Sequence, residues 1–296
     1  MSYLSHWPFD PFLVFAIILV GWHEAGLARL ARSDPERARG RRRRSVWFYG
    51  GLAVTLIAVD SPVEYFADRY FFMHMIQHLL LMFGAPTLIV AGAPWRPLLE
   101  VLPRRVAART GALRVAGGWL ISPWVAVVAF NVVMLGWHIP ALLDLAVSNW
   151  VVQVWLLHPS YLIVGVLFWL QFIPSAPLPM RMPPEGQAVA LVVTNVIMWV
   201  LAMAMGILTT VSWYSVYNHV PGVTLPPFAD QQIGAGILWV CGDFWAIPTL
   251  VVAVRRVIAA DGSLGSALDK MLGRGGTAAG TTGSTGSTGW SSRAGR

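Results

Sequence analysis

Long apolar stretches recur along most of the chain and are separated by short polar segments. A transmembrane helix needs about 20 mostly apolar residues, and seven stretches meet or approach that length. They are residues 11–30, 45–59, 70–91, 119–137, 150–172, 187–211 and 232–254. The second is short unless its helix starts inside the arginine-rich segment before it or continues past Asp60. The pattern therefore predicts an all-α fold, a polytopic membrane bundle of about seven transmembrane helices.

The composition indicates a protein embedded in the lipid bilayer. Hydrophobic residues make up 56% of the 296 residues and charged residues 12%, against about 25% charged residues in ordinary soluble domains. So few charges cannot cover a soluble globule. Residues 1–260 are predicted to form one seven-span membrane domain. Residues 261–296, rich in Gly, Ser and Thr, are predicted to form a flexible cytoplasmic tail.

The basic residues are distributed unevenly between the predicted loops. Arg and Lys are enriched in the cytoplasmic loops of membrane proteins. Of the 21 basic residues, 20 fall in the first, third and fifth loops and after the last span, and only Arg69 falls on the other side. The N-terminus is therefore predicted outside and the C-terminus in the cytoplasm. This topology explains the net charge of +7, so no nucleic-acid partner is predicted.

Four histidines fall in the outer half of the predicted bundle, within spans or at their ends. His74 and His78 form H-M-I-Q-H in the third span, and this spacing puts both rings on one face of a helix. His138 ends the fourth span, and His158 lies within the fifth. Ionisable side chains inside spans are functional candidates because they are costly in hydrocarbon. The sequence thus predicts a polar or metal site at this level.

Two interpretations of these histidines stay open. A histidine pair one turn apart suits two ligands of one metal ion, and the Met-x-Met pairs that include Met73 and Met203 could add thioethers, which select Cu(I). Alternatively, the ring nitrogens hydrogen-bond to polar groups between helices, for example Asp60, Gln77 or Asn131, and the methionines only fill the core.

Acidic residues reach the same level from other elements. Asp60 follows the second span, and Asp144 lies in the loop between the fourth and fifth. Asp230 opens the seventh span, where it could simply cap its own helix. His23 and Glu24, near the inner end of the first span, are interpreted as an interfacial ion pair rather than a second site.

Two further functions compete with a metal site. A b-type haem could be held between helices by two axial histidines, His74 or His78 with His158. Intramembrane His and Asp groups could instead conduct protons or a metal ion. A retinal protein is excluded because the only lysine, Lys270, lies in the tail. No Gly-x-Ser-x-Gly or His-Glu-x-x-His motif indicates a hydrolase.

Several segments resemble a known family. The matching stretches are residues 60–94, which contain H-M-I-Q-H and a later G-A-P, and residues 137–147, 158–169 and 230–239. They resemble the multi-span cytochrome c oxidase assembly factors, the caa3-type CtaG proteins, whose members have about seven spans and a histidine layer near the outer face. One departure is that Trp155 stands near a position where members often carry a further histidine.

The resemblance implies an accessory protein, not an enzyme, that helps to build cytochrome c oxidase in the bacterial cytoplasmic membrane by handling copper at its outer side. The implied partners are oxidase subunits and other copper chaperones. The predicted metal-binding residues are His74, His78, His138 and His158, with Asp60, Gln77, Met73, Asp144, Met203 and Asp230 in support. The thioethers favour Cu(I) as the bound form.

Overall fold

The computed structural model describes residues 10–102 and 122–261, together with residues 265, 266 and 269. Within these ranges the regular structure is helical, apart from one isolated β-bridge between Ser175 and Leu178. The elements are α1 (Phe12–Ser33), α2 (Pro35–Val59), α3 (Pro62–Ala67), α4 (Phe71–Leu79), η2 (Leu80–Gly84), α5 (Ala85–Gly92), α6 (Trp95–Glu100), α8 (Pro123–Trp137), α9 (Pro140–Ser148), α10 (Trp150–Val152), η4 (Gln153–Leu157), α11 (His158–Trp169), α12 (Pro184–Gly206), η5 (Ser215–Tyr217) and α13 (Pro227–Asp261). The all-α prediction is confirmed for this part of the chain.

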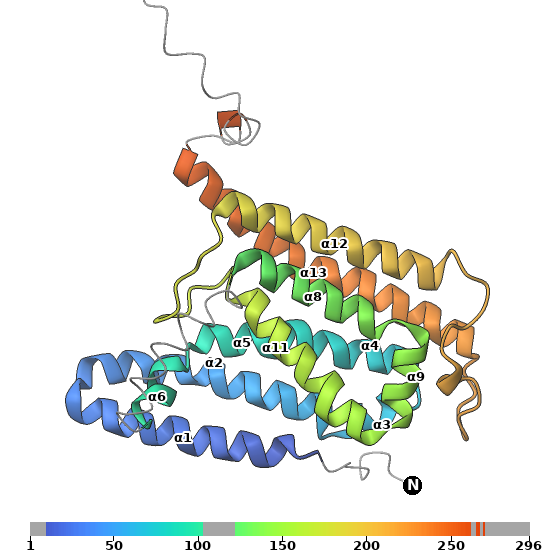
Figure 1. The fold of residues 1–296 in the computed structure, drawn as a ribbon, viewed down its shortest axis with the longest axis horizontal. Coiled ribbons are helices and arrows are strands. Elements are labelled where there is room, and N and C mark those ends of the chain that lie inside the picture. The colour runs from blue at the N-terminus through green and yellow to red at the C-terminus, as the bar shows by residue number, and fades with distance from the viewer. Residues whose placement is uncertain (1–9, 103–121, 262–264, 267–268, 270–296) are drawn as a thin grey trace, which may run out of the picture.

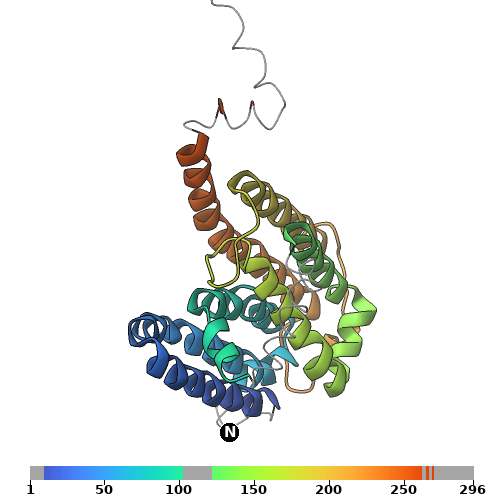
Figure 2. The ribbon, with the colours of Figure 1, turned by 60° about the vertical axis from the view of Figure 1, so that its left-hand side comes forward.

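The long helices run side by side in one bundle (Figure 1). α1 and α2 form a hairpin on one flank, and α12 and α13 pair on the other (Figure 2). Between these pairs, α4, η2 and α5 follow one another as an interrupted central rod that packs against α2, α11 and α13. This rod carries His74 and His78.

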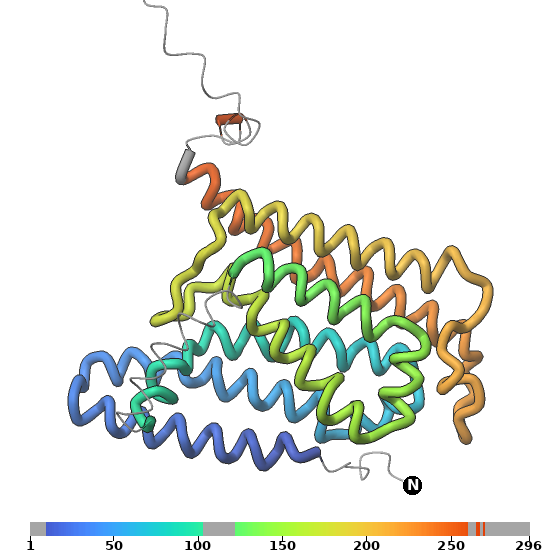
Figure 3. The backbone as a smooth tube through the Cα atoms, viewed as in Figure 1, coloured from blue at the N-terminus to red at the C-terminus, as the bar shows by residue number. Residues whose placement is uncertain are grey.

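Five helices are long and apolar enough to cross a membrane: Phe12–Ser33, Phe71–Gly92, Trp150–Trp169, Pro184–Gly206 and Pro227–Ala259. A sixth candidate is the pair α8 and α9, which is bent by 75°, and the chain turns visibly between them in Figure 3. The remaining predicted span falls in α2. This 25-residue helix starts at Pro35, inside the arginine-rich segment, and only residues 45–59 are continuously apolar. The structure thus supports a multi-pass membrane protein with five or six candidate spans.

The predicted ends of the last two spans differ from the observed helices by a few residues. α12 ends at Gly206 rather than at 211, and α13 starts at Pro227 rather than at 232. Proline is favoured in the first turn of a helix because its missing N–H has no helical partner there, which explains the earlier start of α13. Most of the predicted tail, residues 261–296, lies outside the described residues.

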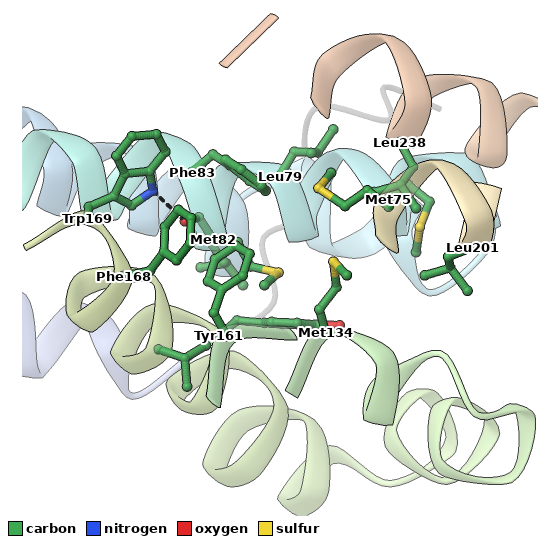
Figure 4. Packing of buried hydrophobic residues seen from close by; sticks show 14 of the residues in the cluster. Met75, Leu79, Met82, Phe83, Met134, Tyr161, Phe168, Trp169, Leu201 and Leu238 are labelled. Carbon is green, nitrogen blue, oxygen red and sulfur yellow. Dashed lines mark hydrogen bonds between the residues drawn. The ribbon is translucent and has the colours of Figure 1, made fainter. Parts of the chain in front are cut away.

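A proline interrupts the central rod. Pro86 has no N–H and cannot donate to the carbonyl of Met82, four residues earlier, and the π-helical segment η2 ends just before this proline. The indole N–H of Trp169 on α11 donates to that carbonyl instead, at 3.1 Å (Figure 4). The helices approach this closely because position 165 is glycine: a Cβ there would lie 2.8 Å from the Met82 oxygen. The interruption therefore also joins the central rod to α11.

Arginine side chains tie together one end of the bundle. Arg29 on α1 donates to carbonyl groups at the end of α6. Arg41 on α2 donates to the carbonyl of Ala176 at 2.9 Å, and Arg256 on α13 to that of Phe172 at 3.1 Å. The basic residues that the sequence assigns to one side of the membrane thus hold neighbouring loops at one end, which we call the arginine end.

Candidate metal centre

All four predicted histidines are buried in the bundle. Their exposed fractions are 0% for His74, 3% for His78, 3% for His138 and 5% for His158. They come from three elements, because α4 carries the first two, the third follows α8 directly and the fourth begins α11. Segments that are distant in the chain thus each bury a histidine inside the bundle.

Three of the histidines form one cluster. The rings of His74 and His78 lie 4.2 Å apart between centroids, and the ring of His78 lies 5.6 Å from that of His138. Within the described part of the chain, neither nitrogen of His74 or of His78 has a hydrogen-bond partner. The ring of Tyr161 packs against His78 at 4.3 Å, and its buried hydroxyl is also without a partner. We call His74, His78 and His138 the histidine cluster.

The hydrogen bonds of His138 decide which of its nitrogens is free to bind a metal. Its Nδ1 lies 2.6 Å from the carbonyl oxygen of Met134. A carbonyl only accepts, so Nδ1 carries the proton and donates. Nε2 keeps its lone pair and faces the sulfur of Met75 at 3.4 Å. Metal-ligating histidines commonly donate their second N–H to such a carbonyl, so this arrangement presents Nε2 as a ligand.

Buried methionines surround the histidine cluster. Met75 and Met134 lie between α4 and α8 (Figure 4), at 0% and 1% exposure. The sulfur of Met205, also fully buried, accepts a hydrogen bond from the hydroxyl of Tyr214, which donates as well to the carbonyl of His138. Of these three sulfurs, the one with a direct contact to a histidine of the cluster is that of Met75.

The other member of each Met-x-Met pair lies elsewhere. Met203 is 37% exposed on the outer surface of α12, and Met73 is half-buried. The two members of a Met-x-Met pair point about 200° apart around a helix, so only one of each can face the cluster. The structure does not bring Met73 or Met203 to the histidines.

The imidazole of His158 faces two carboxylates, neither of them in hydrogen-bonding geometry. Its Nδ1 lies 3.5 Å from a carboxylate oxygen of Asp10, and its Nε2 lies 3.6 Å from one of Glu64. Asp10 also accepts the backbone N–H of Phe12 at the start of α1, at 2.6 Å. Both carboxylates are 5% exposed. Neither Asp10 nor Glu64 is among the predicted site residues, although Glu64 follows Asp60 by four positions at the same predicted level and Asp10 directly precedes the first span.

The acidic residues near His158 are themselves screened from water. Burial raises the pKa of Glu64 well above its usual range, and the neighbouring Asp68 carboxylate adds to the effect. Burial also raises the pKa of Asp68 and of Asp60. The Asp68 carboxylate accepts from Gln153 at 2.8 Å. Carboxyl groups therefore surround His158 on several sides.

Among the described residues, 10–102 and 122–261 included, no three His, Cys, Asp or Glu side chains already stand in the arrangement of a metal site. The rings of the histidine cluster stack edge to face instead of converging on one point, at 69° for His74 and His78. The donor set nevertheless suits a soft ion. Ligand bonds of about 2.0 Å for nitrogen and 2.3 Å for sulfur put two tetrahedral ligands about 3.5 Å apart, close to the 3.4 Å between His138 Nε2 and Met75 Sδ.

The family model for the cytochrome c oxidase caa3 assembly factor, Caa3_CtaG, matches residues 21–260. The chain belongs to this family. The match includes every residue of the histidine cluster and the methionines around it. The family is named for the assembly of an oxidase and not for a reaction of its own.

Relatives of this Caa3_CtaG member occur in mycobacteria. An uncharacterized protein of Mycobacterium bovis and one of Mycobacterium tuberculosis are each 26% identical to it over 281 residues, covering 90% of this chain and 42% of theirs. One of Mycobacterium leprae is 24% identical over 272 residues, covering 86% and 39%. The chain thus spans less than half the length of these relatives. No solved structure matches it.

In this Caa3_CtaG protein, two of the predicted supporting residues hold elements of the site in place. Asp230 on α13 does not cap its own helix. Its two carboxylate oxygens accept the backbone N–H groups of Phe71 and Phe72, at 2.7 and 2.9 Å, and so cap the start of α4. Gln77 donates to Glu64 and to the carbonyl of Ala58, at 2.8 Å for the latter. Both contacts fix the helix that carries His74 and His78.

Asp144 and Asp60 lie further from the cluster. The carboxylate of Asp144 on α9 accepts from the backbone N–H groups of Ser215 and Val216, at 3.1 and 3.2 Å, and so ties the loop after α12 to the bundle. Asp60 is the half-buried residue at which α2 ends. Neither touches a histidine of the cluster through a hydrogen bond among the described residues.

His23 and Glu24, interpreted above as an interfacial pair, meet on one tyrosine. The hydroxyl of Tyr49 donates to Glu24 and lies 2.9 Å from His23 Nδ1, and Arg42 lies 3.5 Å from the Glu24 carboxylate. The structure thus places them in a polar group between α1 and α2, away from the histidine cluster.

Proposed function

We propose that this protein is an accessory factor in the bacterial cytoplasmic membrane that binds Cu(I) at the histidine cluster and passes it to subunits of cytochrome c oxidase. The ligands would be His74, His78 and Nε2 of His138, with the thioether of Met75. The observation that carries the proposal is that the buried ring nitrogens of His74 and His78 have no hydrogen-bond partner among the described residues and lie near a buried sulfur that contacts His138. Membership in the caa3 assembly factor family supplies the oxidase as the destination.

The energetic argument starts from the four nitrogens of His74 and His78. A buried polar group without a hydrogen bond costs about 1–3 kcal/mol in protein mutational data, and buried polar groups are almost always paired. A bound metal ion would satisfy two of these nitrogens at once. Imidazole with thioether selects copper, and the thioether favours Cu(I), so the donor set fits this ion.

The arginine end supports the proposed orientation of the protein. Arg29, Arg41 and Arg256 contact segments that the sequence assigns to the same side of the membrane. Every second loop of the chain therefore lies at this end. Seven crossings, with α2 and the bent α8–α9 pair each counted once, would bring those loops together and leave the N-terminus outside. Cytoplasmic arginines then put the histidine cluster in the outer half, where copper for the oxidase would be received.

The alternatives require other geometries. Bis-histidine haem needs two imidazoles facing each other across a macrocycle, but the closest rings, His74 and His78, lie on one helix at 4.2 Å. The other proposed axial ligand, His158, has both nitrogens directed at carboxylates. A transport path would need polar groups that continue towards the arginine end, and the core there is hydrophobic, with Phe83 and Phe168 beside Trp169 (Figure 4). Copper binding is therefore the preferred function.

The test is the copper content and Cu(I) affinity of the purified protein, measured under reducing conditions beside a His74→Ala/His78→Ala variant. Outer-shell substitutions at metal sites lower affinity about 10–100-fold, so loss of two direct ligands should exceed that range. His219→Ala, at an exposed position of the loop after α12, is the matched control and should bind as the wild type does. His158→Ala should have the smaller effect, because its nitrogens face carboxylates.

Two results would overturn the proposal. One is the absence of stoichiometric copper in wild-type protein that is folded and kept reduced. The other is equal affinity in wild type and the double variant. A Soret band in the purified protein would instead identify haem. Oxidase activity in membranes that contain the double variant as the only copy measures whether the site serves assembly.

A further inference from the structure

A hollow lies at the arginine end, far along the bundle from the histidine cluster. It has a volume of about 440 Å³, within the range of about 300–1,000 Å³ that ligand cavities have. It opens between α5, the end of α11 with the segment after it, and α13. Its lining residues are Thr87, Trp169, Phe172, Ile173, Pro174, Phe244, Trp245, Pro248, Thr249, Val252 and Arg256. We call this hollow the α13 groove.

The walls of the α13 groove are apolar and aromatic along its length. The hydroxyls of Thr87 and Thr249 are already occupied, because each donates to a carbonyl of its own helix. Along α13 the lining runs from Phe244 to Arg256, 12 positions, or about 18 Å of helix. Half of a bilayer core of about 30 Å is about 15 Å thick. The groove therefore matches one leaflet, from near the bilayer centre to the headgroup level.

Arg256 stands at the headgroup end of the groove as a fixed cation. Its Nη1 donates to the carbonyl of Phe172 at 3.1 Å and to the side-chain oxygen of Gln187 at 3.2 Å. A guanidinium has five N–H donors, so donors remain for a ligand. No acidic residue lines the groove, and in the described part of the chain Arg256 forms no ion pair.

We propose that the α13 groove binds an anionic phospholipid, with its phosphate at Arg256 and an acyl chain along the aromatic wall. Arginine pairs with phosphate through two parallel hydrogen bonds, and basic pockets between helices at the cytoplasmic side hold anionic headgroups. The guanidinium at one end of the groove attracts an anion, and the apolar wall favours contact with a hydrocarbon chain. A phospholipid carries both on one molecule.

The lipid would brace the part of the bundle that has the least packing of its own. The C-terminal part of α13 continues beyond the start of α12 (Figure 1), and Phe244, Val251 and Val252 on α13 are 72%, 52% and 47% exposed. An acyl chain between α13 and Trp169 would cover this wall and join α13 to α11. The site does not depend on copper, so it stands or fails separately from the proposed function.

The experiment is native mass spectrometry of the purified full-length protein, titrated with phosphatidylglycerol or with phosphatidylcholine of identical acyl chains. We expect one phosphatidylglycerol per chain, held at least fivefold more tightly than phosphatidylcholine, since a basic residue near anionic lipid contributes about 1 kcal/mol. Arg256→Gln should abolish this preference. Arg255→Gln, which removes the neighbouring exposed arginine, should keep it.

A second pair of variants tests the acyl-chain wall without touching Arg256. Val252→Trp fills the groove and should release both lipids. Val251→Trp makes the same change at the adjacent exposed position, which does not line the groove, and should bind as the wild type does. Equal binding of the two lipids by wild type, or retention of phosphatidylglycerol by folded Val252→Trp, would refute the proposal. If Arg256→Gln does not fold, these two results still test the proposal.

Discussion

The cap that Asp230 provides for α4 can be tested directly. Asp230→Ala removes both acceptors of the Phe71 and Phe72 backbone N–H groups. Asp230 is 2% exposed, so water cannot easily replace the lost carboxylate. Loss of a helix cap costs about 0.5–2 kcal/mol, and a buried donor left without a partner costs about 1–3 kcal/mol. We expect a loss of about 2–3 kcal/mol in the free energy of unfolding.

That loss should appear in thermal unfolding and in copper binding together. For chains of about 150–250 residues, 1 kcal/mol corresponds to a shift in Tm of about 2–4 °C, so the variant should unfold about 5–10 °C below the wild type. His74 lies in the first turn of α4, so fraying there should also weaken Cu(I) affinity, by the 10–100-fold typical of outer-shell partners. Asp230→Asn keeps one acceptor and should fall between.

Asp144→Ala is the matched control, because its carboxylate also accepts backbone N–H groups, but from the half-exposed loop after α12. It should lower Tm less and leave Cu(I) affinity unchanged. The assay is thermal unfolding of detergent-purified protein at one scan rate, followed by a competition titration with a Cu(I) chelator. If Asp230→Ala unfolds within about 1 °C of the wild type, or binds copper as Asp144→Ala does, the capping argument is wrong.

Three further substitutions each test one contact in the structure. Met75→Leu should weaken Cu(I) binding at least tenfold with little change in Tm. Met203→Leu, on the outer surface, is the control and should change neither quantity. Equal Cu(I) affinity in Met75→Leu and the wild type would show that this thioether is not a ligand. Gly26→Ala should cost at least about 1–3 kcal/mol, because its Cβ would meet an α6 carbonyl oxygen at 1.9 Å, whereas Gly136→Ala has open space and should be neutral or stabilising in the same melt. Trp169→Phe should lower stability by about 1–3 kcal/mol through the buried carbonyl it leaves unpaired, and a Tm equal to that of the wild type would show that the carbonyl finds another donor.

The sequence predicts the helices well because apolar length is a local property. It also indicates where α8 ends, since Pro140 follows His138 closely and disfavours helix before it. The course of the chain inside the third span was not predictable in this way. A proline in a span can end, bend or merely loosen a helix, and which of these occurs depends on whether another helix donates to the freed carbonyl. Here the donor is Trp169, more than 80 positions away.

The candidate site was predictable where its signal is local and not where it depends on contacts between distant segments. The spacing of His74 and His78 fixes one shared helix face, and both side chains are indeed buried side by side. The carboxylate partners of His158, by contrast, come from segments distant in the sequence. Asp10 lies just before α1 and Glu64 lies in α3, and only the folded structure shows that both reach the imidazole of His158. The depth of His158 along the membrane does not predict these carboxylate contacts.

Contacts from neighbouring elements also position the helix that carries the proposed ligands His74 and His78. α4 is fixed at its start by Asp230 from α13 and is followed directly by the π-helical segment η2, and π-helical segments concentrate at functional sites. Neither feature is a metal ligand, yet together they fix the rotation of the nine-residue helix that carries His74 and His78. The side chains themselves remain free of hydrogen bonds. Under the proposed function, nitrogens without a hydrogen-bond partner among the described residues would bind Cu(I) without first breaking hydrogen bonds.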